Sequence, residues 1–284
     1  WVGVGGRHES DRQTGISHFI EHLLFKGTRT RSAVSISRAI EGRGGDFNAF
    51  TQEDATCYYV RMAARHGEIA FAILADMLGD PRFAEADVTS EREVIRDEIL
   101  MYRDQPVQVA EDLLGELLWV GHPLGRPLAG RFDSLDRIGR NELFRFKKRG
   151  YVPRATVVAL AGRIRPESWI RRVERSWSSL GSGPGLASAP IDDQVVQQRV
   201  GLAVREVEQT HLALGFRLFG RDDPRRFALK VLSVVLGENM SSRLFQVIRE
   251  RHGLAYAIQS AVSHFSDTGS FVITAGVEPA DLRR

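Results

Sequence analysis

A stretch of small residues divides this chain into two parts, and it constrains the fold more than any other feature. Residues 178–190 read Ser-Ser-Leu-Gly-Ser-Gly-Pro-Gly-Leu-Ala-Ser-Ala-Pro, the composition of a flexible connector that prolines stiffen locally. A length of 284 residues suits two domains of ordinary size. We therefore expect a first domain at 1–180, a linker at 181–190 and a second domain at 191–284.

The first part combines helical periodicity with one hairpin signal. Thr14 can cap a helix that carries apolar residues at 16, 19, 20 and 23, and Ser32 can open a second helix. Residues 46–51 and 56–62 alternate in the way of strands across a short loop, which predicts an antiparallel hairpin. The remaining pattern predicts helices at 65–80, 87–102 and 109–120 and a buried strand at 156–161.

The second part repeats these signals. It contains strand patterns at 211–216, 254–262 and 269–276 and helix patterns at 224–236 and 242–250. Hairpins with helices laid on them, twice over, predict an α+β fold of two related sandwich domains, each an antiparallel sheet with helices packed on it. Because the chain ends directly after a strand, we expect the second domain to be incomplete.

Composition excludes several classes of function. The net charge of +3 is too small to predict binding to nucleic acid or to an anionic membrane. The most apolar stretch, Ile69–Leu78, contains Asp76 and is too short to span a bilayer. A single cysteine, Cys57, excludes an internal disulfide and a multi-cysteine zinc site. Trp1 opens the chain inside an expected strand, so we expect a fragment or a processed product in which any targeting signal is not visible.

The motif His18-Phe19-Ile20-Glu21-His22 carries the strongest chemical signal. Residues three and four apart share one face of a helix, so the two imidazoles lie side by side with Glu21 next to them. Two neutral imidazoles at this spacing can bind one Zn²⁺ at about 2.0–2.1 Å. The adjacent carboxylate can then take the proton from a zinc-bound water. This is the inverted form of the HExxH motif; the alternative is a helix whose histidines merely pack or cap.

A zinc enzyme needs a third protein ligand and an open fourth position. The predicted helix at 87–102 offers four acidic candidates: Glu91, Glu93, Asp97 and Glu98. Glu91 and Glu98 are seven residues apart and therefore share a face, with Cα atoms about 10.5 Å apart. One can bind the metal while the other orients a histidine from behind. Spacing alone does not decide which of the two glutamates is the ligand and which is the support. The alternative for any acidic residue on this helix is a place on a solvated face.

Together these motifs resemble the inverted-zincin metallopeptidases of the pitrilysin and mitochondrial-processing-peptidase type, in particular their bacterial processing-protease-like branch. The segments that carry the resemblance are 15–28, 45–51, 121–127, 241–246 and 249–256. In that family the third ligand follows the second histidine by about 76 residues, a count that leads from His22 to Glu98. The resemblance thus implies that Glu98 binds zinc and that Glu91 supports a histidine.

The resemblance implies two further groups. Asn48, Ala49 and Phe50 are expected to hold the substrate backbone at a sheet edge, where an extended peptide can add as a strand. Arg249 and Tyr256 are expected to donate hydrogen bonds to the scissile carbonyl and to the oxyanion formed from it. Without the resemblance, Asn48 would be interpreted as a turn residue, Arg249 as a helix-end residue and Tyr256 as a core residue.

We therefore expect a zinc metalloendopeptidase that hydrolyses peptides or unstructured protein segments, with Glu21 as the base. Its expected cofactor is Zn²⁺, and its expected partners are a peptide substrate and a second subunit, in a homodimer or in a heterodimer with a related chain. Neither nucleic acid nor a membrane is expected as a partner, and the branch implies a bacterial cytoplasm. The alternative is a non-catalytic or truncated subunit that assembles with a related peptidase; such a subunit would be expected to have lost part of the zinc motif, which is intact here.

Overall fold

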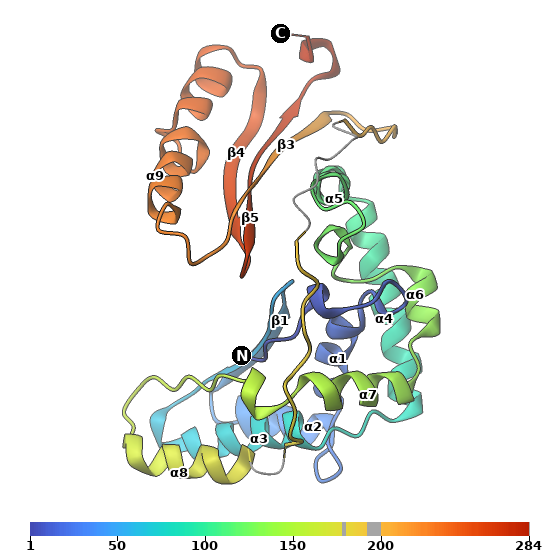
Figure 1. Ribbon diagram of the computed structural model, residues 1–284, viewed down its shortest axis with the longest axis vertical. Coiled ribbons are helices and arrows are strands. Elements are labelled where there is room, and N and C mark those ends of the chain that lie inside the picture. Colours follow the sequence, from blue (N-terminus) through green and yellow to red (C-terminus); the bar gives the residue numbers. More distant parts are fainter. Residues whose placement is uncertain (178–179, 192–199, 284) are drawn as a thin grey trace. The chain divides into compact units, whose positions relative to one another are not determined.

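The computed structural model describes residues 1–177, 180–191 and 200–283 (Figure 1). The chain divides into two compact units: Trp1–Ile99 with Pro127–Ser188, and Leu100–Arg126 with Ala189–Arg284. The sequence-based limits at 180 and 190 stay a prediction. Residues 178–179 and 192–199 lie outside the described residues.

Most of the described helices belong to the first unit. Its elements are α1 (Ile16–Leu24), α2 (Ala33–Glu41), β1 (Asp46–Thr51), β2 (Thr56–Arg61), α3 (Gly67–Gly79), most of α4 (Glu85–Arg103), α6 (Phe132–Arg137), α7 (Arg140–Gly150) and α8 (Pro166–Trp177). The second unit contains α5 (Pro106–Leu118), β3 (Thr210–Phe219), α9 (Arg226–Gly237), a π-helix at Phe245–Arg251, β4 (Ala255–His264) and β5 (Thr268–Val277).

The predicted hairpin of the first unit is present as β1 and β2. The two strands pair antiparallel, and Thr51 lies opposite Thr56. The N–H of Gln52 donates to the carbonyl of Ala55 at 2.9 Å and closes the turn. Within the described part of the chain, β1 pairs with β2 alone. Its outer edge therefore keeps unpaired backbone groups.

The second unit contains an antiparallel sheet with the strand order β3-β5-β4. Helix α9 packs on β4 so closely that a Cβ atom at Gly237 would lie 2.7 Å from the backbone nitrogen of Ser260. Helix α5 packs on β3, where Gly215 meets the side chains of Leu114 and Leu118. Two antiparallel sheets with helices packed on them confirm the predicted α+β class.

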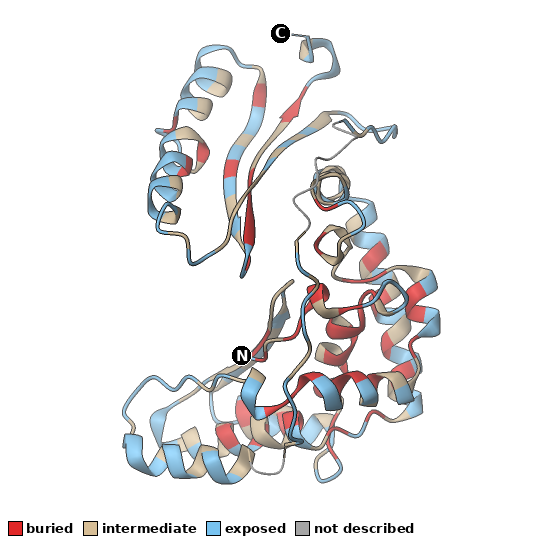
Figure 2. Ribbon diagram, viewed as in Figure 1, coloured by how far each residue is buried: buried red, intermediate tan, exposed pale blue. Residues whose placement is uncertain are grey.

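The core of the first unit is built around α1. Much of this helix is coloured as buried in Figure 2. Its fully buried apolar residues are Ile16, Phe19, Ile20, Leu23 and Leu24. An amphipathic helix buries such a stripe because removing apolar surface from water is favourable. The opposite side of α1 is left to carry polar groups.

The N-terminus of α1 is capped differently from the prediction. The carboxylate of Glu9 accepts hydrogen bonds from the N–H groups of Gly15 at 2.7 Å and Ser17 at 2.8 Å. The hydroxyl of Thr14 instead donates to the carbonyl of Asp11, so the prediction of a Thr14 cap was wrong. A carboxylate from outside the helix can replace the usual capping residue because the first N–H groups of a helix need an acceptor of any kind. Gly15, with φ of 93°, occupies the left-handed region that glycine tolerates.

Two other local predictions need correction. Residues 156–161 form no strand: Thr156 pairs with Val2 in an isolated bridge, and Val157 is 64% exposed. The helix predicted at 242–250 is a π-helix at Phe245–Arg251. By contrast, Ser32 caps α2 as predicted by accepting from the N–H of Ser35 at 3.2 Å, and Cys57 is a buried free thiol.

None of the described helices combines the length and apolarity needed to cross a bilayer.

Candidate metal centre

Three side chains from two helices converge beside α1. His18 and His22 come from α1 and Glu98 from α4. The Nε2 atoms of the two histidines are 3.2 Å apart. The Glu98 Oε2 atom lies 3.6 Å from Nε2 of His18 and 3.5 Å from Nε2 of His22. Among the described residues, this is the group of three potential metal ligands whose donor atoms lie within 4.8 Å of one another.

The donor triangle fits a tetrahedral metal site. Bonds of about 2.0–2.1 Å to a tetrahedral zinc place neighbouring ligand atoms about 3.3–3.4 Å apart, and the observed separations are 3.2, 3.5 and 3.6 Å. The three protein donors also leave a fourth tetrahedral position open, as catalytic zinc sites do. The residues present therefore fit zinc in number, in type and in spacing.

The protonation of His18 suits a metal ligand. Burial lowers the pKa of His18 to about 4; the neighbouring His22 also lowers it, and Glu98 partly opposes them. The imidazole is therefore neutral at physiological pH, which is the form that donates a lone pair to a metal. Its Nδ1 atom is buried and has no hydrogen-bond partner in the described chain.

Glu91 lies behind His22. Its side chain is buried, and its Oε2 atom is 3.2 Å from Nδ1 of His22. A carboxylate that accepts a hydrogen bond from Nδ1–H fixes the tautomer in which Nε2 is free to bind metal. The other carboxylate oxygen pairs with Nζ of Lys26. Sequence reasoning missed Lys26, which lies two residues beyond the end of α1 at Leu24.

Glu21 accepts a hydrogen bond from the hairpin of β1 and β2. The hydroxyl of Thr51, the last residue of β1, donates to Glu21 Oε2 at 2.5 Å. Burial raises the pKa of Glu21; the Thr51 hydrogen bond and His22 lower it in part, and Glu98 adds to the rise. Sequence reasoning missed Thr51 as well, because nothing in the spacing connects residues 21 and 51.

The three predicted substrate-binding residues lie on β1, whose outer edge pairs with no strand among the described residues. Asn48 and Phe50 are exposed, and Ala49 is half-buried. The side-chain oxygen of Asn48 accepts a hydrogen bond from the backbone N–H of Ala49 at 2.8 Å. The ring of Phe50 lies edge-on to the ring of Trp1, with centroids 5.4 Å apart. Asn48 is thus part of a strand and not a turn residue.

Arg249 and Tyr256 lie together in the second unit. The guanidinium carbon of Arg249 is 4.8 Å from the centroid of the Tyr256 ring and 4.6 Å from that of Phe245, within the range of a cation–π contact. Tyr256 is 76% exposed, so the interpretation as a core tyrosine is wrong. Both side chains can therefore offer donors to a ligand from the same surface of that unit.

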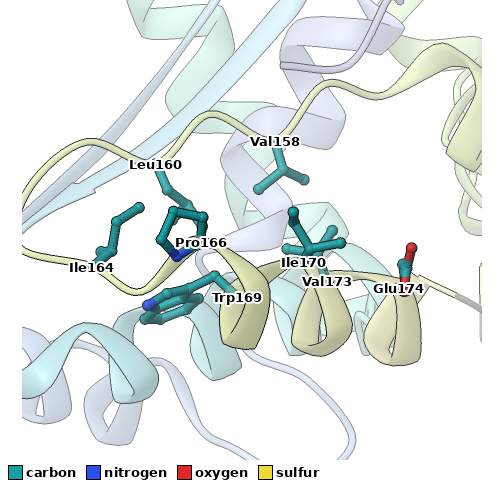
Figure 3. A pocket seen from close by; sticks show the side chains of 8 residues that line it. All are labelled: Val158, Leu160, Ile164, Pro166, Trp169, Ile170, Val173 and Glu174. Carbon is teal, nitrogen blue, oxygen red and sulfur yellow. The ribbon is translucent and has the colours of Figure 1, made fainter.

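A separate apolar pocket of about 270 Å³ lies beside α8 (Figure 3). Its lining includes Val158, Leu160, Trp169 and Ile170, with Glu174 at one end. It contains none of the predicted metal ligands or the predicted base. The candidate metal ligands are therefore not part of this pocket.

Comparison with protein families gives two consecutive matches. Residues 1–131 match the family model described as insulinase (peptidase family M16). Residues 137–284 match the model described as peptidase M16 inactive domain. The three predicted metal ligands and Glu21 lie in the first segment, whereas Arg249 and Tyr256 lie in the second.

Related sequences carry the name "uncharacterized zinc protease". One, from Streptomyces coelicolor, is 38% identical over 288 residues and is matched over 99% of this chain and 63% of its own length. Another, from Bacillus subtilis, is 37% identical over 287 residues and is matched over 100% of this chain and 69% of its own length. The chain thus spans about two thirds of the length of these relatives.

Solved structures share the fold. A protease from Helicobacter pylori gives a TM-score of 0.88 at 23% identity, covering 98% of this chain and 68% of that one. A peptidase M16 inactive domain from Pseudomonas fluorescens gives 0.90 at 23% identity with the same coverage. Pitrilysin gives 0.72 at 17% identity, covering 99% of this chain and 31% of its own.

Proposed function

The chain belongs to the insulinase-type peptidase family M16, and from this premise we propose that it is a zinc-dependent endopeptidase of peptides or unstructured protein segments. The observation that carries the proposal is the donor triangle of His18, His22 and Glu98 with Glu21 on the adjoining turn of α1. The names of the related zinc proteases support the same cofactor.

Each residue of the centre has a separate role in the proposed reaction. His18, His22 and Glu98 would hold zinc, which when bound supplies Lewis acidity toward water and the scissile carbonyl. Glu91 holds His22 in the metal-binding tautomer through Nδ1. Glu21 takes the proton of the attacking water on its Oε1 atom, because Oε2 already accepts from Thr51. The same carboxyl group then gives that proton to the leaving amine.

The substrate backbone is proposed to bind at the outer edge of β1. Asn48, Ala49 and Phe50 lie on this edge strand, and unpaired N–H and C=O groups bind an extended peptide without regard to its side chains. The substrate must therefore be locally extended, which favours unfolded segments over folded proteins. Assembly with a second or related subunit and a bacterial cytoplasmic location are further proposals that rest on the family resemblance.

The test of this function is zinc-dependent hydrolysis. The purified full chain is expected to contain about one zinc per chain and to cleave a quenched fluorescent peptide. A chelator should abolish cleavage, and added zinc should restore it, because the open centre exchanges its metal. Zinc content and cleavage rate are both measured. A chain that binds one zinc without cleaving any peptide would favour the non-catalytic subunit, for which the name of the second family model is the supporting observation.

Arg249 and Tyr256 are proposed to stabilise the oxyanion of the tetrahedral intermediate. Arg249→Ala and Tyr256→Phe should each lower kcat by about 10²–10³, the usual effect of removing one oxyanion donor, and leave the zinc content unchanged. Arg251→Ala is the matched control, since Arg251 is an exposed arginine of the same π-helix. Equal activity of Arg249→Ala and Arg251→Ala would remove Arg249 from the mechanism.

A further inference from the structure

The contact between Thr51 and Glu21 links two parts of the chain that are 30 residues apart. The hydroxyl of Thr51 donates to Oε2 of Glu21 at 2.5 Å. This distance is that of an O–H group donating to a carboxylate oxygen. In the described chain, Oε2 accepts this bond and Oε1 has no hydrogen-bond partner. The two oxygens of the base are therefore in different environments.

The hairpin holds the Thr51 hydroxyl in place. Thr51 pairs with Thr56 across β1 and β2, and the next residue closes the turn through the bond from the N–H of Gln52 to the carbonyl of Ala55. A β-branched side chain has few accessible χ1 rotamers. The donor is therefore fixed by the backbone of the sheet and does not depend on a flexible side chain.

Glu21 needs such a support more than the other acidic residues of the centre do. Glu91 is held from two sides, by His22 and by Lys26, and Glu98 faces both histidines. Glu21 accepts one hydrogen bond, that from Thr51. A glutamate has several rotatable bonds, so without this bond its carboxylate would sample several rotamers.

We propose that Thr51 is a positioning residue that holds Glu21 by Oε2 and so reserves Oε1 for the proton of the attacking water. This inference rests on the proposed function, because it assigns Glu21 the role of base. A misplacement of about 1 Å can cost on the order of 10² in rate. Thr51 therefore acts on the chemical step and leaves zinc binding and substrate affinity unchanged.

The experiment compares three variants of the full chain. Thr51→Val removes the hydroxyl and keeps the shape, and Thr51→Ser keeps the hydroxyl. Thr56→Val is the matched control: Thr56 lies directly opposite Thr51, is buried, and donates to the carbonyl of Val4 at 2.8 Å. Zinc content, thermal midpoint, kcat and KM for a quenched peptide are measured for each, and crystal structures of wild type and Thr51→Val are compared.

Thr51→Val is expected to lower kcat about 10- to 100-fold with KM within about twofold of wild type, and its Glu21 carboxylate should leave the position seen beside Thr51. Thr51→Ser should restore most of kcat. Thr56→Val should lower the thermal midpoint and keep kcat. A Thr51→Val protein with wild-type kcat, or one in which Glu21 has not moved, overturns the inference.

The result separates this inference from the proposed function. If the wild-type chain binds no zinc and cleaves no peptide, the proposed function is wrong. The crystal structures then decide whether Thr51 positions Glu21. If the wild type is active and Thr51→Val is equally active, the function stands and the role of Thr51 is wrong.

Discussion

His22→Ala and Glu98→Ala are each expected to yield a folded chain that loses zinc on dialysis and cleaves no peptide. Each change removes one corner of the donor triangle, in which the three atoms are 3.2–3.6 Å apart. Structural zinc sites with four protein ligands bind the metal with about 10–16 kcal/mol, which averages roughly 3 kcal/mol for each ligand. The loss of one ligand should therefore lower zinc affinity by about 10²-fold or more. Elemental analysis after dialysis against metal-free buffer measures the loss.

Two further variants, both on α4, are expected to have smaller effects on zinc binding. Glu91→Gln weakens the support of His22 and should lower zinc affinity by about 10- to 100-fold, the usual effect of changing a group behind a ligand. Glu93→Gln should leave zinc affinity unchanged, because Glu93 is exposed and its side chain pairs with Arg96 at 3.7 Å. If His22→Ala and Glu98→Ala both keep one zinc per chain, the assignment of the ligands is wrong.

Glu21→Gln is expected to keep its zinc and to lose about 10²–10⁴ in kcat, the usual contribution of a general base. Glutamine keeps the size of the side chain and can still accept the hydrogen bond from Thr51. It cannot take a proton from water at neutral pH. The measurement is kcat for a quenched peptide together with the zinc content of the same preparation.

The control for this variant is Glu41→Gln, which removes one exposed carboxylate at the end of α2. It should retain wild-type kcat. Loss of zinc from Glu21→Gln would instead make Glu21 a metal ligand. Wild-type kcat in Glu21→Gln would show that another group takes the proton.

Local sequence patterns predicted much of the fold. The α2 cap at Ser32 and the hairpin of β1 and β2 depend on neighbouring residues, and the structure contains both. Predictions failed where groups outside the element itself decided the result. Glu9 replaced Thr14 at the start of α1, and residues 156–161 form an isolated bridge between Thr156 and Val2 instead of a strand.

The metal centre likewise has one part that follows from local sequence and another that depends on tertiary packing. The side-by-side placement of His18 and His22 follows from the sequence alone, because the pitch of a helix brings residues i and i+4 onto one face. Spacing within α4 could not decide between Glu91 and Glu98, because both share a face of that helix. The tertiary structure places Glu98 at the Nε2 atoms and Glu91 at Nδ1 of His22. The contacts of Thr51 and Lys26 likewise exist only after packing, since a hydrogen bond or ion pair depends on where separate elements meet.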